Sequence, residues 1–154
     1  MTLDINEPTD QRLISEIAEY IRENRVAINA ISGSGNVGYT SLTIAAGSTS
    51  LSIGTDLGNY SIEIVKVTGG GAATIATILG GTAGQVKIFI FQDGNIDITD
   101  GNAKANGVFY LNQLPAGSDL NASQDDILAV VNIGGDGGST YGYWKELFRS
   151  LSVK

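Results

Sequence analysis

The sequence predicts a mainly β protein, in which an N-terminal amphipathic helix precedes a Gly-rich antiparallel β-sandwich or barrel. Helical apolar spacing is confined to residues 8–31, and short alternating stretches follow from Gly33 onward. Glycine supplies 21 of the 154 residues and separates these stretches from one another. We therefore expect residues 1–35 to form an arm and helix for attachment or oligomerisation, and residues 36–154 to form the β domain.

The predicted helix has a definite start, a definite end and a regular apolar spacing. Pro8 suits a first helical turn because it lacks the N–H that would stay unpaired there, and Gly33 suits the end. Apolar residues and one asparagine recur at alternating steps of three and four: Ile14, Ile17, Ile21, Asn24, Ile28 and Ile31. Isoleucine at both core positions of a heptad favours trimers or tetramers over dimers, and a buried Asn24 would fix the register.

The helix has two possible partners, and the sequence leaves both open. It could associate with copies of itself, or it could pack on the β domain or on another protein. Val26 lies at an outward heptad position, which favours the second alternative. The residues that we expect to contact the partner are Leu13, Ile14, Ile17, Tyr20, Ile21, Asn24 and Ile28.

The β region contains eight or nine short strands at roughly ten-residue spacing, which is typical of a sandwich or barrel. We expect strands at 42–44, 51–53, 60–67, 75–79, 86–91, 96–98, 108–111, 127–133 and 141–151. Asp93-Gly94 and Asp136-Gly137 each lie between two of these strands. Because Asp-Gly readily adopts the positive φ angles of tight turns, both pairs predict hairpins.

Aromatic residues gather on the last strand of the chain. We expect Tyr143, Trp144 and Phe148 to lie at a subunit interface, with the core of the chain as the alternative. A platform for a sugar ligand is the third possibility.

The composition removes the commonest catalytic and binding chemistries. Without cysteine there are no disulfides or thiolates, and without histidine the commonest general base and metal ligand are missing. The formal charge of −7 repels phosphate backbones, so we expect no nucleic-acid partner. The N-terminus lacks the pattern of a secretory signal, and no apolar run is long enough to span a bilayer.

Three motifs carry possible chemistry, and each fails in context. Residues 33–38 match G-x-G-x-x-G, but the motif follows a helix and opens β structure, the reverse of a dinucleotide site. Residues 93–97 begin like a calcium loop, yet Ile98 and Lys104 replace its essential glycine and acid. The adjacent Asp125 and Asp126 would point apart. We therefore expect no enzyme, no catalytic residue, no cofactor and no metal.

The order of segments in the last third resembles that of a known group of proteins. Its elements are Gly84-Gln85-Val86 to Phe91-Gln92-Asp93, then residues 112–122, an apolar strand, a Gly/Asp turn, and Tyr143-Trp144-Lys145-Glu146 ending in Arg149-Ser150. This order is similar to the distal β domain of tailed-bacteriophage surface proteins, namely head decoration proteins, head spikes and tail fibres. The segments Gln11–Glu23 and Val26–Ala30 are similar to N-terminal segments of such proteins, so the resemblance covers residues 9–31 and about 84–152.

The resemblance implies a homotrimeric virion protein, made in the host cytoplasm and located on the capsid surface. Because the chain is short and has no repetitive shaft, we expect a head decoration (cement) protein that binds the major capsid protein and stabilises the shell. The alternative is a fibre or spike tip that binds a host glycan.

Overall fold

The computed structural model describes residues 36–101, 104–111, 118–134 and 142–151, all within the compact unit Asn36–Lys154. The predicted helix at 8–31 lies outside the described residues. So do its expected contact residues Leu13, Ile14, Ile17, Tyr20, Ile21, Asn24 and Ile28.

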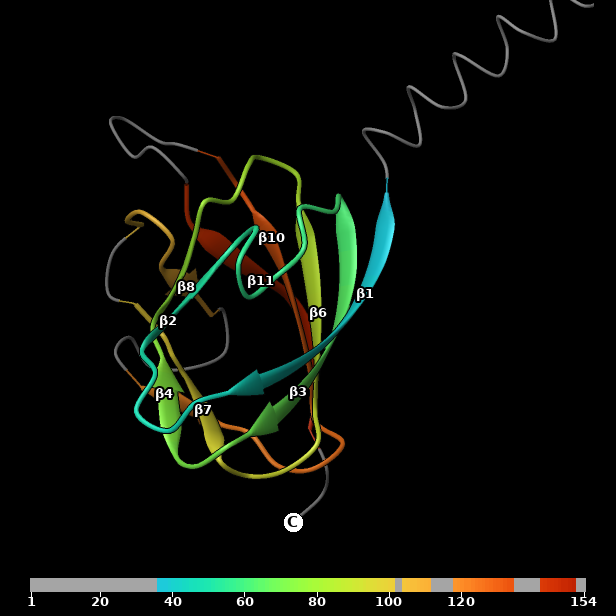
Figure 1. The fold of residues 1–154 in the computed structure, drawn as a ribbon. Helices are drawn as coiled ribbons and strands as arrows, with labels where there is room; N and C mark the ends of the chain where they lie inside the picture. Colours follow the sequence, from blue (N-terminus) through green and yellow to red (C-terminus); the bar gives the residue numbers. More distant parts are fainter. Residues whose placement is uncertain (1–35, 102–103, 112–117, 135–141, 152–154) are drawn as a thin grey trace, which may run out of the picture. The chain divides into compact units, whose positions relative to one another are not determined.

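The described residues form a mainly β structure, as the sequence predicts. The strands are β1 (Val37–Ile44), β2 (Ser50–Ser52), β3 (Ile62–Gly69), β4 (Ala73–Ile75), β5 (Thr77–Leu79), β6 (Val86–Phe91), β7 (Ile96–Thr99), β8 (Phe109–Tyr110), β9 (Asp119–Asn121), β10 (Ile127–Asn132) and β11 (Trp144–Ser150). A six-stranded sheet has the order β1-β3-β6-β10-β11-β8 (Figure 1). A three-stranded sheet has the order β4-β7-β9, and β2 pairs with β5.

The expectation of an antiparallel domain is wrong in most of these pairs. Five of the eight strand pairs are parallel, and only β10 with β11, β10 with β6, and β7 with β9 are antiparallel. Val37 pairs with Ile62, 25 residues later, and Ile62 pairs with Val86, another 24 residues later. The chain therefore returns to the large sheet in successive coils, and its crossings contribute strands to the small sheets.

One predicted hairpin is wrong and the strand pairing of the other is confirmed. Strands β6 and β7, on either side of Asp93-Gly94, belong to different sheets. Asp93 instead holds a crossing turn, in which its Oδ2 accepts from Gly69 N at 2.8 Å and its Oδ1 from Asn95 N at 3.0 Å. Strands β10 and β11 pair antiparallel as expected, while Asp136-Gly137 lies outside the described residues.

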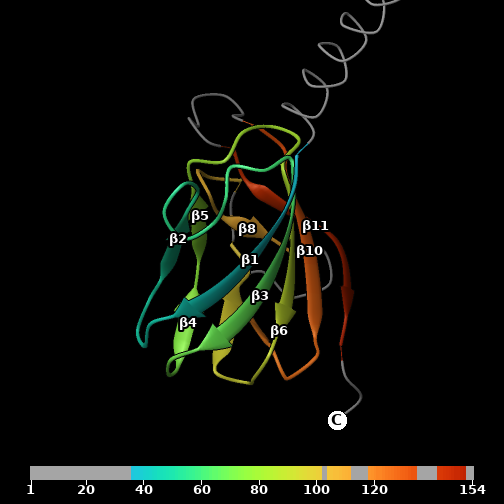
Figure 2. The ribbon, with the colours of Figure 1, turned by 45° about the vertical axis from the view of Figure 1, so that its right-hand side comes forward.

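The core lies between the large sheet and the small sheets, and Figure 2 shows β2, β4 and β5 on one side of the large sheet. We call this side of the large sheet its inner face. Its buried side chains and those of the small sheets include Val65, Val67, Phe89, Phe91, Leu128, Ile75, Ile78, Ile96 and Ile98. Trp144 is fully buried, and its Nε1 donates to the carbonyl oxygen of Ile78 at 3.0 Å. This bond joins β11 to β5 across the core.

Candidate functional site: the two faces of the large sheet

The inner face contains an ion pair whose two side chains are fully buried. Glu63 on β3 and Lys87 on β6 are register neighbours with fully buried side chains. Lys87 Nζ lies 2.5 Å from Glu63 Oε2. Burial lowers the pKa of Lys87 from its ordinary value, and the hydrogen bond and charge of Glu63 oppose that shift in part.

The ion pair also fixes the loop that leads into β3. Glu63 Oε1 accepts from Gly58 N at 2.8 Å and from the Thr40 hydroxyl. Lys87 Nζ donates to the Gly58 carbonyl oxygen at 2.7 Å. A Cβ at residue 58 would lie 3.0 Å from Glu63 Oε1 and 2.1 Å from the Tyr60 ring, so the close approach requires glycine. Glu63 and Lys87 therefore hold the backbone at Gly58 against the large sheet through hydrogen bonds.

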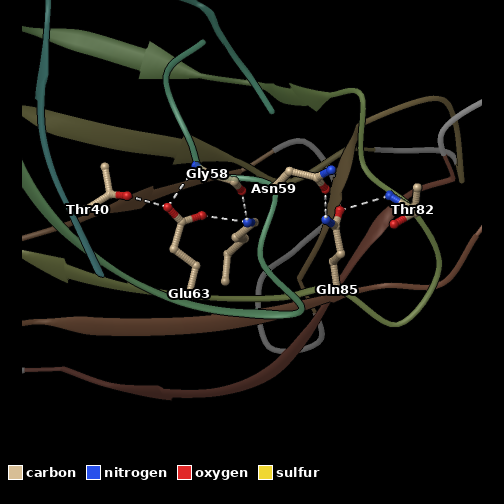
Figure 3. Close-up of polar contacts among 7 residues, drawn as sticks. Thr40, Gly58, Asn59, Glu63, Thr82 and Gln85 are labelled. Atoms are coloured by element: carbon tan, nitrogen blue, oxygen red, sulfur yellow. Dashed lines mark hydrogen bonds and ion pairs between the residues drawn. The ribbon is translucent and has the colours of Figure 1, made fainter. Parts of the chain in front are cut away.

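A second polar contact joins successive coils beside the ion pair. Gln85 Nε2 donates to Asn59 Oδ1 at 2.8 Å, and Gln85 Oε1 accepts from Thr82 N at 2.9 Å (Figure 3). Asn59 and Gln85 each follow a glycine and precede a strand of the large sheet. In the described residues, no buried side-chain nitrogen or oxygen lacks a hydrogen-bond partner. This polar region is closed and internally satisfied, which indicates a structural role.

The carboxylates that the sequence singles out hold turns. Asp93 holds the crossing turn described above, and Asp126 Oδ2 accepts from Ser123 N at 2.8 Å, in the turn where Asp125 has φ +68°. The described residues contain no group of three or more acidic side chains placed to hold a metal ion. The expectations of no metal and no catalytic residue remain predictions.

The opposite side of the large sheet, its outer face, is apolar over much of its area. Strand register aligns its side chains in two rows. The first row is Val37, Ile62, Val86 and Val131, and the second is Tyr39, Ile64, Ile88, Ala129 and Phe148. Both rows run across β1, β3, β6 and β10 to β11, where the first ends at Lys145 and the second at Phe148.

Several side chains of the outer face are strongly exposed. Val37 is 67% exposed, Tyr39 61% and Phe148 51%. The only charged residues at outward positions on the described strands of this face are Lys66 and Lys145, although the chain carries a net charge of −7. An apolar surface that continues across several strands marks an interaction site more often than bare solvent contact. The outer face is therefore the candidate functional site.

The three aromatic residues predicted at a subunit interface do not share one surface. Trp144 is fully buried and Tyr143 is 6% exposed, so both belong to the interior of the chain rather than to an exposed interface. The Tyr143 ring meets Tyr110 edge to face at 5.9 Å, and Lys104 Nζ lies 5.6 Å from its centroid. Only Phe148 lies on the outer face.

One feature of the sequence could have predicted that the outer face is apolar. Ile64 is followed directly by Val65, which breaks the alternation of β3 and makes both of its sides apolar. A strand that is apolar on both sides is typical of a sheet that is covered on both sides.

Comparison with protein-family models, curated proteins and solved structures finds no significant match to this chain. None of the described residues forms a helix that is long and apolar enough to cross a membrane.

Proposed function

We propose that this chain is a non-enzymatic structural protein of a bacteriophage virion, a decoration protein that binds the head shell as a trimer. The observation that carries the proposal is the apolar outer face, on which Val37, Tyr39 and Phe148 are strongly exposed. Burial of such a face against another protein gains hydrophobic free energy in proportion to the apolar area removed from water. Association is therefore the activity that the geometry supports best.

The polar features of the structure favour association over catalysis. A catalytic acid or base has to reach its substrate, whereas Glu63 and Lys87 are fully buried and bonded to each other and to Gly58. The carboxylates near the surface, such as Asp93, hold turns. These groups serve the stability of the fold.

The location on a phage head rests on the resemblance at residues 9–31 and 84–152. In this proposal residues 1–35 bind the major capsid protein, and the β domain projects from the capsid surface after synthesis in the host cytoplasm. A trimer that contacts several capsid subunits would stabilise the shell because it binds only the assembled state.

The structure weakens the alternative of a glycan-binding tip. That alternative depends on aromatic rings that stack on a sugar, and burial of Tyr143 and Trp144 removes the two best candidates. Tyr39 and Phe148 are exposed, but they lie at opposite ends of one apolar row, with Ile64, Ile88 and Ala129 between them. That arrangement suits a broad protein contact better than a sugar site.

Attachment to the shell can be tested on the full chain. The Ile17→Asp/Ile21→Asp variant places two charges in the predicted contact stripe, at a cost of several kcal/mol if that stripe is desolvated on binding. The matched control, Ser15→Asp/Asn29→Asp, places the same charges at outward heptad positions. We expect the control to co-sediment with purified head shells and the stripe variant to stay in the supernatant.

Circular dichroism separates loss of attachment from loss of folding. Both variants should keep the β spectrum, because the β domain has its own core. Undiminished shell binding by the stripe variant, or failure of the unaltered chain to bind shells, would contradict the proposal.

A further inference from the structure

We infer that the outer face is the contact between copies of this chain, and that three outer faces meet about the trimer axis as one shared apolar core. This inference rests on the proposed self-association. It assigns the interface to the outer face instead of to Tyr143 and Trp144.

The polarity of β3 at its start supports a contact between outer faces. Glu63 points into the protein, whereas its neighbours Ile62 and Ile64 point outward, and Ile62 is 41% exposed. Both apolar rows extend this outward character across the sheet. Across β1, β3, β6 and β10, the two rows carry no polar side-chain group apart from the Tyr39 hydroxyl, and such a surface fits another apolar sheet face, because sheets pack face to face through interdigitated side chains.

The distribution of charge over the chain also supports this contact. Two chains that each carry −7 repel one another, and the repulsion is weakest where carboxylates are missing. On the described strands, the outward positions of this face include no Asp or Glu. Lys66 and Lys145 are its only charges: Lys66 lies beside the two rows and Lys145 at the β11 end of the first, so the apolar centre of the face carries no charge. This distribution favours a second copy of the chain.

Residues 1–35 connect to the large sheet at the start of β1. They enter β1 at Val37, the most exposed large apolar side chain in the described residues. The predicted trimeric register ends at Ile31, six residues earlier, and six residues span at most about 20 Å. Association of three N-terminal segments would hold the three Val37 side chains within that reach of the axis, which raises their effective concentration.

The edge of the sheet at β1 supports the same contact. Ile62 N donates to Asn36 O, and Gly70 N donates to Ile44 O, so even-numbered residues of β1 bond to β3. The backbone groups of Val37, Tyr39, Ser41 and Thr43 therefore face the open edge. The strand has eight residues and no charge, and edges of that kind are normally covered. Three sheets about an axis place each edge beside the next sheet.

The test compares two double-lysine variants of the full chain by sedimentation equilibrium. Val37→Lys/Tyr39→Lys charges the outer face, whereas Thr74→Lys/Asn121→Lys adds the same charge at exposed positions of the three-stranded sheet. We expect the unaltered chain and the control to be trimers at micromolar concentration. The face variant should be monomeric, with its dissociation constant raised at least 100-fold and an unchanged β spectrum.

Single cysteines provide a second readout that does not depend on destabilisation, since the chain contains no native cysteine. Val37→Cys should form disulfide-linked pairs on mild oxidation, and Thr74→Cys should not. A face variant that remains trimeric, or absence of linked Val37→Cys pairs in a trimer, would overturn the inference.

A monomeric unaltered chain with an outer face protected from hydrogen exchange would also overturn it, because residues 1–35 would then cover the face. Shell co-sedimentation keeps the two proposals apart. If the face variant remains trimeric and still binds shells, the inference about the outer face is wrong, while the proposed binding to the head shell stands.

Discussion

At one end of the large sheet, a charged side chain is buried on the inner face and an apolar one is exposed on the outer face. At the other end, the apolar side chain is buried and the charged one is exposed. At the start of β3, the charged Glu63 is buried, while the adjacent Ile62 is 41% exposed. At the end of the same strand, Val67 is buried and Lys66 is exposed, as the hydrophobic effect requires. The inverted end is the one where residues 1–35 join the sheet.

At this end of β3 an apolar side chain, Ile62, lies outside the core of the single chain, while the charged Glu63 lies inside it. A shift of β3 by one residue would turn Ile62 and Ile64 inward and Glu63 outward. The Glu63–Lys87 pair opposes that shift, because each charge is satisfied only in the observed register. The same shift would expose Val65 and Val67, which are buried, so we interpret the pair as one of the elements that fix this register.

The largest expected effect comes from breaking this pair on the inner face. Lys87→Met leaves the Glu63 carboxylate buried without its cation and should lower the free energy of unfolding by about 3–5 kcal/mol. Urea denaturation followed by circular dichroism measures the loss.

The double variant Glu63→Gln/Lys87→Met serves as the control, because it removes both charges and keeps an acceptor for Gly58 N. It should recover at least half of that loss. If the double variant is as unstable as the single one, the charge imbalance is not the cause of the instability.

The next effect compares the same truncation on the two faces of β10. Leu128 is fully buried on the inner face, and Leu128→Ala should cost about 2–5 kcal/mol at every protein concentration. Ile127 lies next to it on the outer face and is only half-buried. Ile127→Ala should therefore cost less in the monomer and more at concentrations where copies associate.

Thermal melting over a hundred-fold range of protein concentration measures both variants. A loss for Ile127→Ala that does not depend on concentration would mean that the outer face is not a contact between copies.

The sequence predicted strand positions better than it predicted strand neighbours. The β stretches and the β10–β11 pairing follow from period-2 alternation and turn residues. Parallel pairing does not follow from these signals, because it depends on which distant segments return to the same sheet. The dipeptides Gly-Asn at 35–36 and 58–59 and Gly-Gln at 84–85 precede β1, β3 and β6, and this repeat could have predicted the coils.

The candidate site was found in the sequence only through Phe148. Alternation identifies the two faces of a strand, but it does not show which face other strands cover. Trp144 illustrates the problem, because an aromatic residue on a terminal strand can seal a core or lie at an interface. Its position is decided by the bond to the Ile78 carbonyl oxygen, 66 residues earlier in the chain, which local patterns do not report.

A smaller effect is expected at the ordinary end of the sheet, where Asp93 holds the crossing from β6 to β7. Asp93→Ala removes the acceptors for Gly69 N and Asn95 N and should cost about 1–2 kcal/mol. Because this turn lies away from the apolar rows, the loss should be equal in monomer and trimer. Asp93→Asn keeps one acceptor oxygen and should recover part of the loss, and melting curves at two protein concentrations test both expectations.

The smallest expected effect is a pH dependence confined to the inner face. Burial lowers the pKa of Lys87 below its ordinary value of 10.5, and Glu63 only partly reverses the shift. Below the lowered pKa, Lys87 is protonated in both the folded and the unfolded chain, so it does not make the free energy of unfolding depend on pH. Between that pKa and 10.5, the unfolded chain binds more protons, and the contribution of Lys87 to stability therefore rises with pH.

The stability difference between the unaltered chain and Glu63→Gln/Lys87→Met should grow through this window and level off above 10.5, because the variant lacks the titrating amine. Urea midpoints between pH 7 and 11 measure it, and a difference that falls as pH rises would show that pairing with Glu63, rather than burial, dominates the environment of Lys87.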